Sequence, residues 1–463
     1  MTTRSFDVVV VGAGPAGEVA AGRLAEGGLD VAIVECELVG GECSYWACMP
    51  SKALLRPPQA LAEARRVPGA AQAVTGELDA GAALRRRDKV IHDLDDAGQL
   101  PWLEDRGVTL VRGSAVLDGE RRVRVDDDIL DARRAVVLAT GSAATLPPVE
   151  GLEDAVTWTT REATTARAVP GRLLVLGGGV AGVELADAWN RLGAQVTVVE
   201  VADRVLTREE PFASEQVAGA LAERGVDVRT GVEVRRAERA GDEVRLTLKG
   251  GETLAGDELL VAAGRRPRTK GLGLEALGLK DGEPVPTDEH LRARGHDWLY
   301  AIGDCNGRVL LTHQGKYHAR IAADHLLGRP GARLVHDGPL SPRVVFTEPQ
   351  VAAVGRTLGD ACDAGLDVRC VEVGTNANAG GSFTGKRVKG TARLVVDERR
   401  GVIVGATFTG AEVAEMLHAA TIAVVGEVTI DRLWHAVPAF PTRSELWLRL
   451  LEAYESRASG AVR

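Results

Sequence analysis

Two cysteines five positions apart, Cys43 and Cys48, are the residues of this chain whose type and spacing most directly suggest chemistry. On a regular helix, positions i and i+5 are separated by roughly 7.5 Å of rise, whereas a disulfide needs Cα atoms within about 7 Å. A bridge therefore requires a bent or unwound turn. Pro50 and an apolar helical run follow, and a thiolate at Cys48 would face the positive end of that helix, which lowers a thiol pKa. The pattern fits a reactive pair or two buried thiols.

Composition helps to decide whether Cys43 and Cys48 are a reactive pair or two buried thiols. The 463 residues suggest about three domains, and a net charge of −9 argues against a nucleic-acid partner. No apolar run reaches the ~18 residues of a membrane span, and the N-terminus has no signal-peptide pattern. No His, Cys or carboxylate spacing predicts a metal site. Six cysteines do not make a secreted disulfide framework. We expect a cytoplasmic protein, in which a close cysteine pair is more often catalytic than structural.

A strand, a glycine-rich turn, a helix, a second strand and a terminal acid follow one another near the N-terminus. The apolar run over residues 6–11 is typical of a buried parallel strand. Glycines let the backbone approach a pyrophosphate, the helix N-terminus favours its charge, and the acid would bind ribose hydroxyls. The residues of this predicted dinucleotide site are Gly12, Gly14, Gly17 and Glu35.

The same unit recurs after a strand predicted over residues 172–176. The distance from first glycine to acid is 23 residues in both copies, from 12 to 35 and from 177 to 200. An acid at this position accepts ribose hydroxyls and repels a 2′-phosphate, which favours NADH over NADPH, although Arg204 nearby leaves NADPH as the alternative. The residues of this second site are Gly177, Gly179, Gly182 and Glu200.

Two dinucleotide sites with a cysteine pair after the first describe an electron relay from nicotinamide through flavin to disulfide. In this order of motifs the chain resembles, over essentially its whole length, the flavin-dependent pyridine nucleotide–disulfide oxidoreductases, such as lipoamide dehydrogenase, glutathione reductase and mercuric reductase. Further motifs resemble the turn that closes the family's flavin domain, the end of its nicotinamide domain and its second flavin contact. Their residues are Thr140 and Gly141, Gly264, and Gly303 with Asp304.

The resemblance implies FAD at the first site, NADH at the second and a homodimer that shares its active site across the interface. Cys48 would lie against the flavin as the charge-transfer thiol, and Cys43 would be the outer thiol that attacks the substrate, a small molecule or disulfide. Lys52 would lie near flavin N5 and pair with Glu184, where its charge would stabilise the reduced flavin.

The implied fold class is α/β, with two Rossmann-type dinucleotide-binding domains and a C-terminal α+β dimerisation domain. We predict that the FAD-binding domain takes residues 1–150 and returns over residues 268–335. The NAD(H)-binding domain would take residues 151–267, and the interface domain residues 336–463.

The C-terminal motif departs from the family. Its members normally carry a His, followed by Pro-Thr and a Glu, where the His is the acid–base partner of the outer thiol. Here Phe440 takes the place of the His, and Glu445 is retained. Phe has no proton to give, and a positioned acid–base group contributes typically ~10²–10⁴ in rate. We therefore do not expect fast reduction of lipoamide or glutathione disulfide.

Several functions fit this departure. The first is an NADH-dependent flavoenzyme that reduces the Cys43–Cys48 disulfide and then an unusual acceptor, or that bypasses the disulfide as a diaphorase and reduces a quinone or oxygen. The second is a carbon–carbon cleaving enzyme, because the 2-ketopropyl coenzyme M carboxylating branch resembles the chain at Phe440; that branch, however, replaces the Glu with His. The third is a redox sensor without turnover. Tyr45 and Trp46, between the cysteines, either wall the substrate side or pack beneath the pair.

Overall fold

The structure is a computed structural model that describes residues 2–385 and 388–459. The chain divides into two compact units, each made of three segments. The first unit consists of Met1–Pro50, Arg86–Thr145 and Gly264–Gly338, and the second of Ser51–Arg85, Leu146–Ala263 and Pro339–Arg463. Breaks near 145 and 264 lie close to the predicted domain boundaries, but the domain bounds themselves stay predictions.

A seven-stranded sheet forms the core of the first unit, with the order β3-β2-β1-β6-β5-β4 and β16 beside β6. β1, β2, β3, β6 and β16 pair in parallel, and β4 and β5 continue the sheet antiparallel. Apolar β-branched side chains fill both faces of β1, as expected for a covered parallel strand. The strands are β1 (Thr3–Val11), β2 (Val31–Glu35), β3 (Thr109–Arg112), β4 (Ala115–Leu117), β5 (Arg122–Val125), β6 (Asp128–Leu138) and β16 (Leu299–Ala301).

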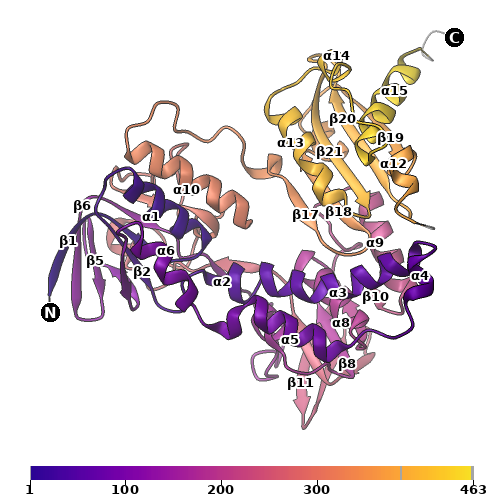
Figure 1. The fold of residues 1–463 in the computed structure, drawn as a ribbon. Coiled ribbons are helices and arrows are strands. Elements are labelled where there is room, and N and C mark those ends of the chain that lie inside the picture. The colour runs from indigo at the N-terminus through magenta and orange to yellow at the C-terminus, as the bar shows by residue number, and fades with distance from the viewer. Residues whose placement is uncertain (1, 386–387, 460–463) are drawn as a thin grey trace. The chain divides into compact units, whose positions relative to one another are not determined.

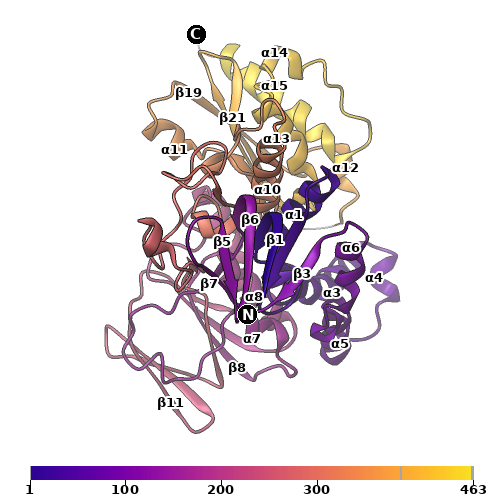
Figure 2. The same cartoon turned by 90° about the vertical axis from the view of Figure 1, so that its left-hand side faces the viewer.

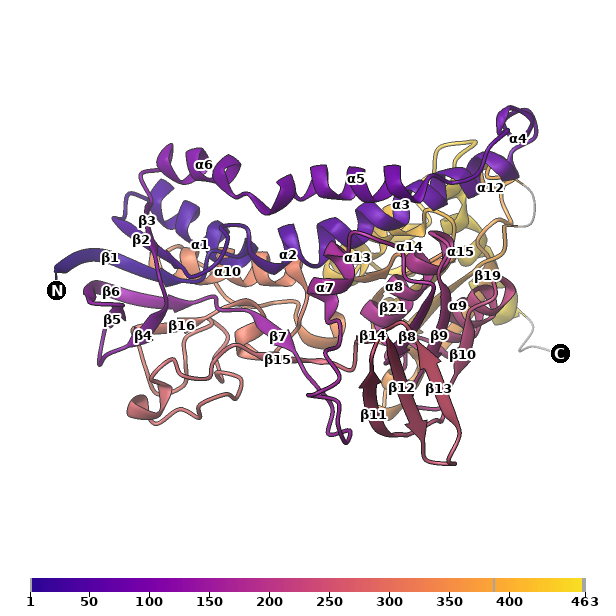
Figure 3. The same cartoon turned by 90° about the horizontal axis from the view of Figure 1, so that it is seen from below.

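Two helices of the first unit pack closely because small residues face each other. α1 (Pro15–Glu26) follows β1, and α10 (Thr312–Leu326) follows β16. A Cβ added at Gly315 would lie only 3.4 Å from the Cβ of Ala16. Figures 1 and 3 show α1 and α10 side by side, and Figure 2 shows α1 next to β1. The unit also holds α2 (Gly41–Tyr45), α6 (Leu100–Glu104) and a small two-stranded sheet of β7 (Ser142–Ala144) and β15 (Arg265–Pro267).

The second unit begins with a parallel four-stranded sheet of order β10-β9-β8-β14 and an antiparallel three-stranded sheet, β11-β12-β13. The strand predicted over residues 172–176 is confirmed as β8, and the second strand of the repeated unit is β9. The elements are α7 (Thr160–Thr165), β8 (Arg172–Leu176), α8 (Val180–Arg191), β9 (Gln195–Val199), α9 (Pro211–Glu223), β10 (Asp227–Arg229), β11 (Val234–Ala240), β12 (Glu243–Leu248), β13 (Thr253–Gly256) and β14 (Glu258–Val261).

A five-stranded antiparallel sheet of order β17-β18-β21-β20-β19 forms the C-terminal part of the second unit. Its apolar face packs around Phe408, which is fully buried. The elements are β17 (Arg343–Val345), β18 (Gln350–Gly355), α11 (Leu358–Asp363), β19 (Val368–Gly374), α12 (Ala379–Ser382), β20 (Thr391–Asp397), β21 (Val402–Gly410), α13 (Leu417–Val425), α14 (Ile430–Leu433) and α15 (Leu446–Ser459).

Between α2 and α6 the chain forms three further α-helices: α3 (Cys48–Arg66), α4 (Ala70–Ala73) and α5 (Ala80–Val90). α3 and α5 run side by side (Figures 1 and 3). Among the residues that the structure describes, no helix combines the length and apolar character that crossing a membrane requires.

Candidate active site

Cys43 and Cys48 lie on two different helices, because the chain unwinds between them. α2 ends at Tyr45, Trp46 has a non-helical φ of −132°, and α3 begins at Cys48 itself. The unwound turn that a Cys43–Cys48 bridge would require is thus present. Both cysteines are free thiols, and the Cys43 thiol is hydrogen-bonded to that of Cys48. The pair therefore has the proximity that thiol–disulfide chemistry needs.

The first residue of α10 contacts this pair. The Oγ1 atom of Thr312 lies 3.4 Å from Sγ of Cys48, and the same hydroxyl hydrogen-bonds the Cys43 thiol. The N-termini of two helices, α3 and α10, thus meet at Cys48, and their positive ends favour a thiolate there. Sequence reasoning missed Thr312: a helix over this stretch is readable from the sequence, but its neighbours, 264 positions away, are not.

The surroundings of Cys43 oppose its ionisation. The hydrogen bond with Cys48 and then burial raise the pKa of the Cys43 thiol far above its usual range. The Thr312 hydroxyl and the Lys316 ammonium act in the opposite direction. A thiol that attacks as a thiolate needs such compensation, because the thiolate is the nucleophile.

Glu18, in the first turn of α1, was also missed by sequence reasoning. Burial raises the pKa of the Glu18 carboxyl to about 7, the Lys316 ammonium opposes this shift, and the Glu35 carboxylate adds to it. A carboxyl that changes charge near neutral pH is unusual for a glutamate.

The first glycine turn fits a dinucleotide pyrophosphate. A Cβ at Gly17 would lie 1.8 Å from the carbonyl oxygen of Gly12, so only glycine allows this crossing. At Gly14, by contrast, no atom of residues 2–385 and 388–459 lies within 4 Å of the position of a Cβ. The backbone is therefore open at the N-terminus of α1, where a pyrophosphate would bind. Glu35 Oε2 accepts a 2.7 Å hydrogen bond from the Ala13 amide, which fixes the carboxylate beside the turn.

The predicted second flavin contact has a defined orientation. The Ser142 hydroxyl donates a 2.5 Å hydrogen bond to Oδ2 of Asp304, and Arg265 Nε donates to the Ser142 hydroxyl at 2.8 Å. This chain of bonds holds the Asp304 carboxylate while leaving lone pairs for a polyol such as the ribityl chain. Ser142 and Arg265 are further residues that the sequence did not reveal.

The remaining residues of the predicted flavin site lie at turns of the first unit. A Cβ at Gly12 would lie 3.2 Å from the Thr140 amide, so the end of β6 adjoins the glycine turn. Gly141, Gly264 and Gly303 adopt positive φ values of 72°, 136° and 69°. The structure thus brings Thr140 next to the predicted pyrophosphate site and places the three glycines where the chain turns between β-strands or into a 3-10 helix.

The second glycine turn, in the second unit, repeats the first closely. A Cβ at Gly182 would lie 1.9 Å from the Gly177 carbonyl oxygen, and the position above Gly179 is open. Glu200 Oε2 accepts a 2.5 Å hydrogen bond from the Gly178 amide. A dinucleotide therefore fits here for the same reasons.

Arg204, which left NADPH as an alternative, is engaged locally. Its guanidinium donates to the carbonyl oxygens of Leu206, Thr207 and Glu209 at 2.7 to 3.2 Å. Binding a 2′-phosphate would require breaking these bonds, so the arrangement favours NADH.

Lys52 and Glu184 form the ion pair that the resemblance implies. Lys52 Nζ lies 2.6 Å from Oε2 of Glu184, and Oε1 of the same carboxylate accepts a 2.8 Å hydrogen bond from the Phe346 amide. The Lys52 ammonium also lies 4.8 Å from the centroid of the Phe346 ring. Both oxygens of this buried carboxylate therefore have partners. The role of Lys52 beside a flavin stays a prediction.

The C-terminal motif presents an apolar side chain and a buried acid. Phe440 is 76% exposed, whereas Glu445 is 7% exposed. Among residues 2–385 and 388–459, Oε2 of Glu445 has no hydrogen-bond partner, and Oε1 lies 3.9 Å from Arg449 Nη2. Glu445 is thus buried, although one of its carboxylate oxygens has no close partner among the described residues.

Tyr45, one of the two aromatic residues between the cysteines, is 1% exposed and makes an edge-on contact with Trp46, with ring centroids 5.7 Å apart. This favours a packing role for Tyr45 over a wall of the substrate site.

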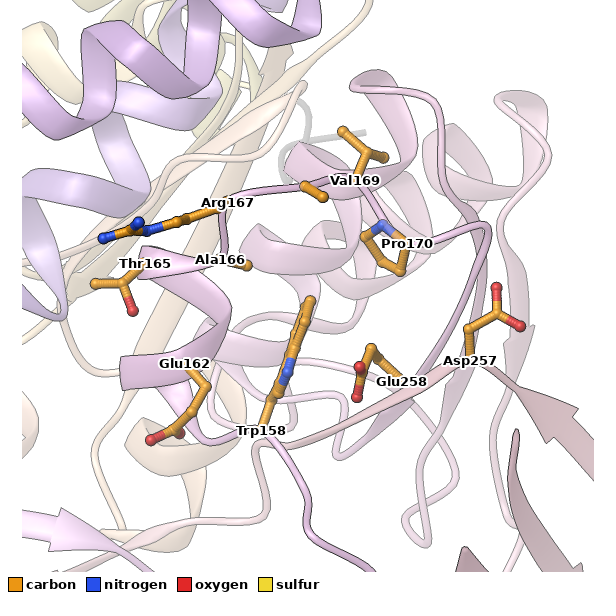
Figure 4. A pocket seen from close by; sticks show the side chains of 10 residues that line it. Trp158, Glu162, Thr165, Ala166, Arg167, Val169, Pro170, Asp257 and Glu258 are labelled. Carbon is orange, nitrogen blue, oxygen red and sulfur yellow. The ribbon is translucent and has the colours of Figure 1, made fainter. Parts of the chain in front are cut away.

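A surface hollow of about 530 Å³ in the second unit contains none of the predicted site residues (Figure 4). Its three carboxylates are engaged: Glu162 with Thr159, Asp257 with Arg172 and Glu258 with Arg239. Its lining consists of Trp158, Glu162, residues 165–170, Asp257 and Glu258.

Known proteins resemble the chain over nearly all its length. Dihydrolipoyl dehydrogenase of Thermus scotoductus is 32% identical, with 98% of each chain covered. Mercuric reductase of Streptomyces lividans is 32% identical, with 93% of each covered. Among solved structures, the HOCl-induced flavoprotein disulfide reductase RclA of Escherichia coli superposes with a TM-score of 0.85 at 26% identity, covering 96% of this chain and 99% of that one. LpdA of Mycobacterium tuberculosis gives 0.85 at 26% identity, covering 98% and 99%.

The sequence matches two family descriptions, one over its first two thirds and one over its C-terminal part. Residues 6–320 match the pyridine nucleotide-disulphide oxidoreductase family, and residues 341–450 match its dimerisation domain. With its glycine turns, free cysteine pair and C-terminal dimerisation domain, the chain belongs to the pyridine nucleotide–disulphide oxidoreductase family of FAD- and NAD(P)H-dependent enzymes.

Proposed function

We propose that this chain is a homodimeric enzyme that carries electrons from NADH through FAD to the Cys43–Cys48 pair and on to an acceptor whose released group is stable as an anion. The observation that carries the last part is the pair of Phe440 and Glu445. By the family resemblance, Phe440 stands where the acid–base His is expected and has no exchangeable proton. Oε2 of Glu445, the acid that would orient the His, has no hydrogen-bond partner among residues 2–385 and 388–459.

When bound, FAD supplies a carrier for the electron pair of NADH. The chain's own residues bind and orient it: the Gly14 turn would take the pyrophosphate, and Asp304 would hold the ribityl hydroxyls. Lys52, fixed by Glu184, would supply a positive charge. In the second unit, Glu200 and the engaged Arg204 favour NADH.

The transfer to a disulfide acceptor balances without outside reagents. The Cys43 thiolate attacks one sulfur of the acceptor, a Cys43–acceptor disulfide forms, and the other sulfur leaves as a thiolate. The Cys48 thiolate then attacks the Cys43 sulfur, so that the internal disulfide forms and the second half of the acceptor leaves as a thiolate. Two electrons have moved to the acceptor, and NADH restores the dithiol.

The missing imidazole decides which acceptors react fast. A leaving thiolate of high pKa needs a proton as it departs, whereas one of low pKa leaves without it. With Phe440 in place, we expect the chain to prefer acceptors with weakly basic leaving groups, such as aromatic disulfides, over alkyl disulfides. The relatives are named as a dihydrolipoyl dehydrogenase and a mercuric reductase, so the carbon–carbon cleaving alternative is not favoured.

A leaving-group series tests this proposal. The NADH-dependent rate is measured with disulfides of similar size whose thiols range from aromatic to alkyl, for the natural protein, Phe440→His and the control Phe440→Leu. We expect a steep fall in rate as leaving-group pKa rises, which Phe440→His flattens and Phe440→Leu does not. Equal slopes in all three proteins would count against the proposal.

A further inference from the structure

We infer that His318 is a positioning residue for FAD, which holds the Gly303–Asn306 turn so that the Asp304 carboxylate on this turn meets the ribityl chain. The inference deepens the proposed function, in which Asp304 holds the ribityl hydroxyls, and rests on it. His318 lies in the middle of α10 and is fully buried. A buried imidazole needs hydrogen-bond partners for its ring nitrogens, and here these partners belong to the turn and to a carboxylate.

The backbone of the Gly303–Asn306 turn approaches α10 closely. A Cβ added at Gly315 would lie only 3.3 Å from Cα of Gly303. Gly315 and His318 are three positions apart on α10, so they lie on the same helix face. The Gly303 amide donates a 3.4 Å hydrogen bond to Nδ1 of His318. Because Gly303 directly precedes Asp304, this bond fixes the backbone from which the Asp304 carboxylate extends.

The same ring nitrogen of His318 also contacts the other end of the turn. Nδ2 of Asn306 lies 3.3 Å from Nδ1 of His318. The Asn306 amide has a defined orientation, because its Oδ1 accepts a 3.0 Å hydrogen bond from the Arg308 backbone amide and its Nδ2 donates to the Ala301 carbonyl oxygen at 3.1 Å. Nδ1 of His318 therefore faces two donors, so it carries a lone pair and the ring proton is on Nε2.

A carboxylate on the opposite side of the ring fixes this tautomer. Nε2 of His318 lies 3.2 Å from Oδ1 of Asp337, which accepts its proton in a hydrogen bond. Arg308 donates to Oδ2 of Asp337 at 2.9 Å, and Gln314 donates to Oδ1 at 3.1 Å. Although burial acts in the opposite direction, the hydrogen bond with His318 holds the pKa of the Asp337 carboxyl far below its usual range. Asp337 therefore stays an acceptor, and His318 keeps its lone pair toward the turn.

Asp304 is thus held from two sides. The Ser142 hydroxyl bonds its carboxylate, and His318 bonds the backbone directly before it. Hydrogen bonds weaken steeply when their geometry is lost. A turn that has moved would therefore bind the ribityl hydroxyls less tightly, even though Asp304 is still present.

Two substitutions that each keep one side of the ring's bonding test the inference without turnover. In His318→Asn, the amide oxygen can take the place of Nδ1 and accept from Gly303, but the bond to Asp337 is lost. In His318→Gln, the amide NH₂ group can reach Asp337, but the acceptor beside Gly303 is lost. The FAD-loaded proteins are diluted, and ultrafiltration with absorbance measures how fast FAD is released.

We expect His318→Gln to release FAD about tenfold faster than the natural protein, because two hydrogen bonds to the turn are lost, and His318→Asn to stay within about threefold. The control His325→Gln, two turns further along α10, loses a 2.8 Å hydrogen bond with the Tyr300 hydroxyl and should change the rate little. A role in packing alone would give the reverse order, because Asn leaves the larger cavity. Equal rates for His318→Gln and His318→Asn, or a faster rate for His318→Asn, would overturn the inference.

Asp337→Ala decides if neither His318 variant can be loaded with FAD. Without this acceptor the imidazole can carry its proton on Nδ1, where the proton would oppose the two donors of the turn. FAD release should then be at least about threefold faster. An unchanged rate would overturn the inference.

Asp304→Asn separates this inference from the proposed function. We expect Asp304→Asn to release FAD faster than the natural protein, because a charged acceptor for the ribityl hydroxyls is lost. Faster release from Asp304→Asn together with equal rates for the two His318 variants would overturn this inference alone. An unchanged rate for Asp304→Asn would remove the proposed flavin contact itself, and the inference with it.

Discussion

Glu184 and Glu445 are both buried glutamates of the second unit, and they differ in what surrounds their carboxylates. Glu184 is 3% exposed and has a partner at each oxygen, the Lys52 ammonium and the Phe346 amide. Glu445 is 7% exposed, and Oε2 has no partner among the residues that the structure describes. A buried polar group without a partner costs stability, so the carboxylate of Glu445 is retained at a cost that Glu184 does not carry.

Glu184 and Glu445 are proposed to act in different steps of the electron transfer: Glu184 beside the flavin, and Glu445 where the acceptor is reduced. The residues proposed to receive electrons from NADH include the Lys52–Glu184 pair, whereas the proposed acid–base position holds Phe440, which cannot protonate a departing thiolate. We therefore expect the protein to oxidise NADH efficiently but to reduce only a limited range of acceptors at a high rate.

The largest expected effect comes from removing the charge of Glu184. Glu184→Gln leaves the Lys52 ammonium facing a neutral amide. Breaking a buried pair costs about 3–5 kcal/mol, and because the Lys52 side chain is 34% exposed, we expect a loss of about 2–3 kcal/mol in the free energy of unfolding. Urea unfolding measures it, with the exposed Glu215→Gln on α9 as control. If Glu184→Gln lost no more unfolding free energy than Glu215→Gln, the proposed contrast between Glu184 and Glu445 would be contradicted.

Restoring the imidazole gives the next effect. Phe440→His offers Glu445 a partner and the leaving thiolate a proton, so the rate with an alkyl disulfide should rise about 10–100-fold, below the full ~10²–10⁴ of a well-positioned acid–base group. Steady-state kinetics measure this. In the double variant Phe440→His with Glu445→Gln, most of the gain should vanish; an undiminished gain would show that Glu445 does not orient the introduced imidazole.

A smaller effect concerns Glu18 and pH. The folded-state pKa of about 7 lies above the usual 4.5, so the folded protein holds a proton that the unfolded chain has lost, and stability falls as pH rises through this window. Glu18→Gln removes the fall and should be more stable than the natural protein above pH 7 by about 1–2 kcal/mol. Thermal unfolding at a series of pH values checks this, with Glu104→Gln as control. A constant difference from pH 4.5 to 8 would contradict the assignment.

The smallest effect is expected at Glu445 alone. Glu445→Gln replaces a buried carboxylate, one oxygen of which has no partner among the described residues, by a neutral amide. The free energy of unfolding should therefore rise or fall by less than about 1 kcal/mol. Urea unfolding beside Glu184→Gln gives a matched pair. A loss as large as that of Glu184→Gln would mean that Glu445 has a charged partner in the assembled enzyme.

Features carried by local spacing were predictable from the sequence. The glycine turns, the strands at β8 and β9 and the break between Cys43 and Cys48 follow from contacts among residues close along the chain. The surroundings of Cys43 were not predictable, because Thr312 and Lys316 reach it only through the packing of α10. The raised pKa of Glu18 was not predictable either, because burial causes it and burial depends on how the helices pack. The pairing of Lys52 with Glu184 came from the family resemblance and not from spacing.

An anaerobic titration of the FAD-loaded protein with NADH, followed by absorbance, tests the central claim that electrons pass through the cysteine pair. We predict a long-wavelength band after two electron equivalents, which reports the Cys48 thiolate against oxidised flavin, and its absence in Cys48→Ser. Bleaching of the flavin in the natural protein without that band would contradict the account, because the disulfide would then be bypassed.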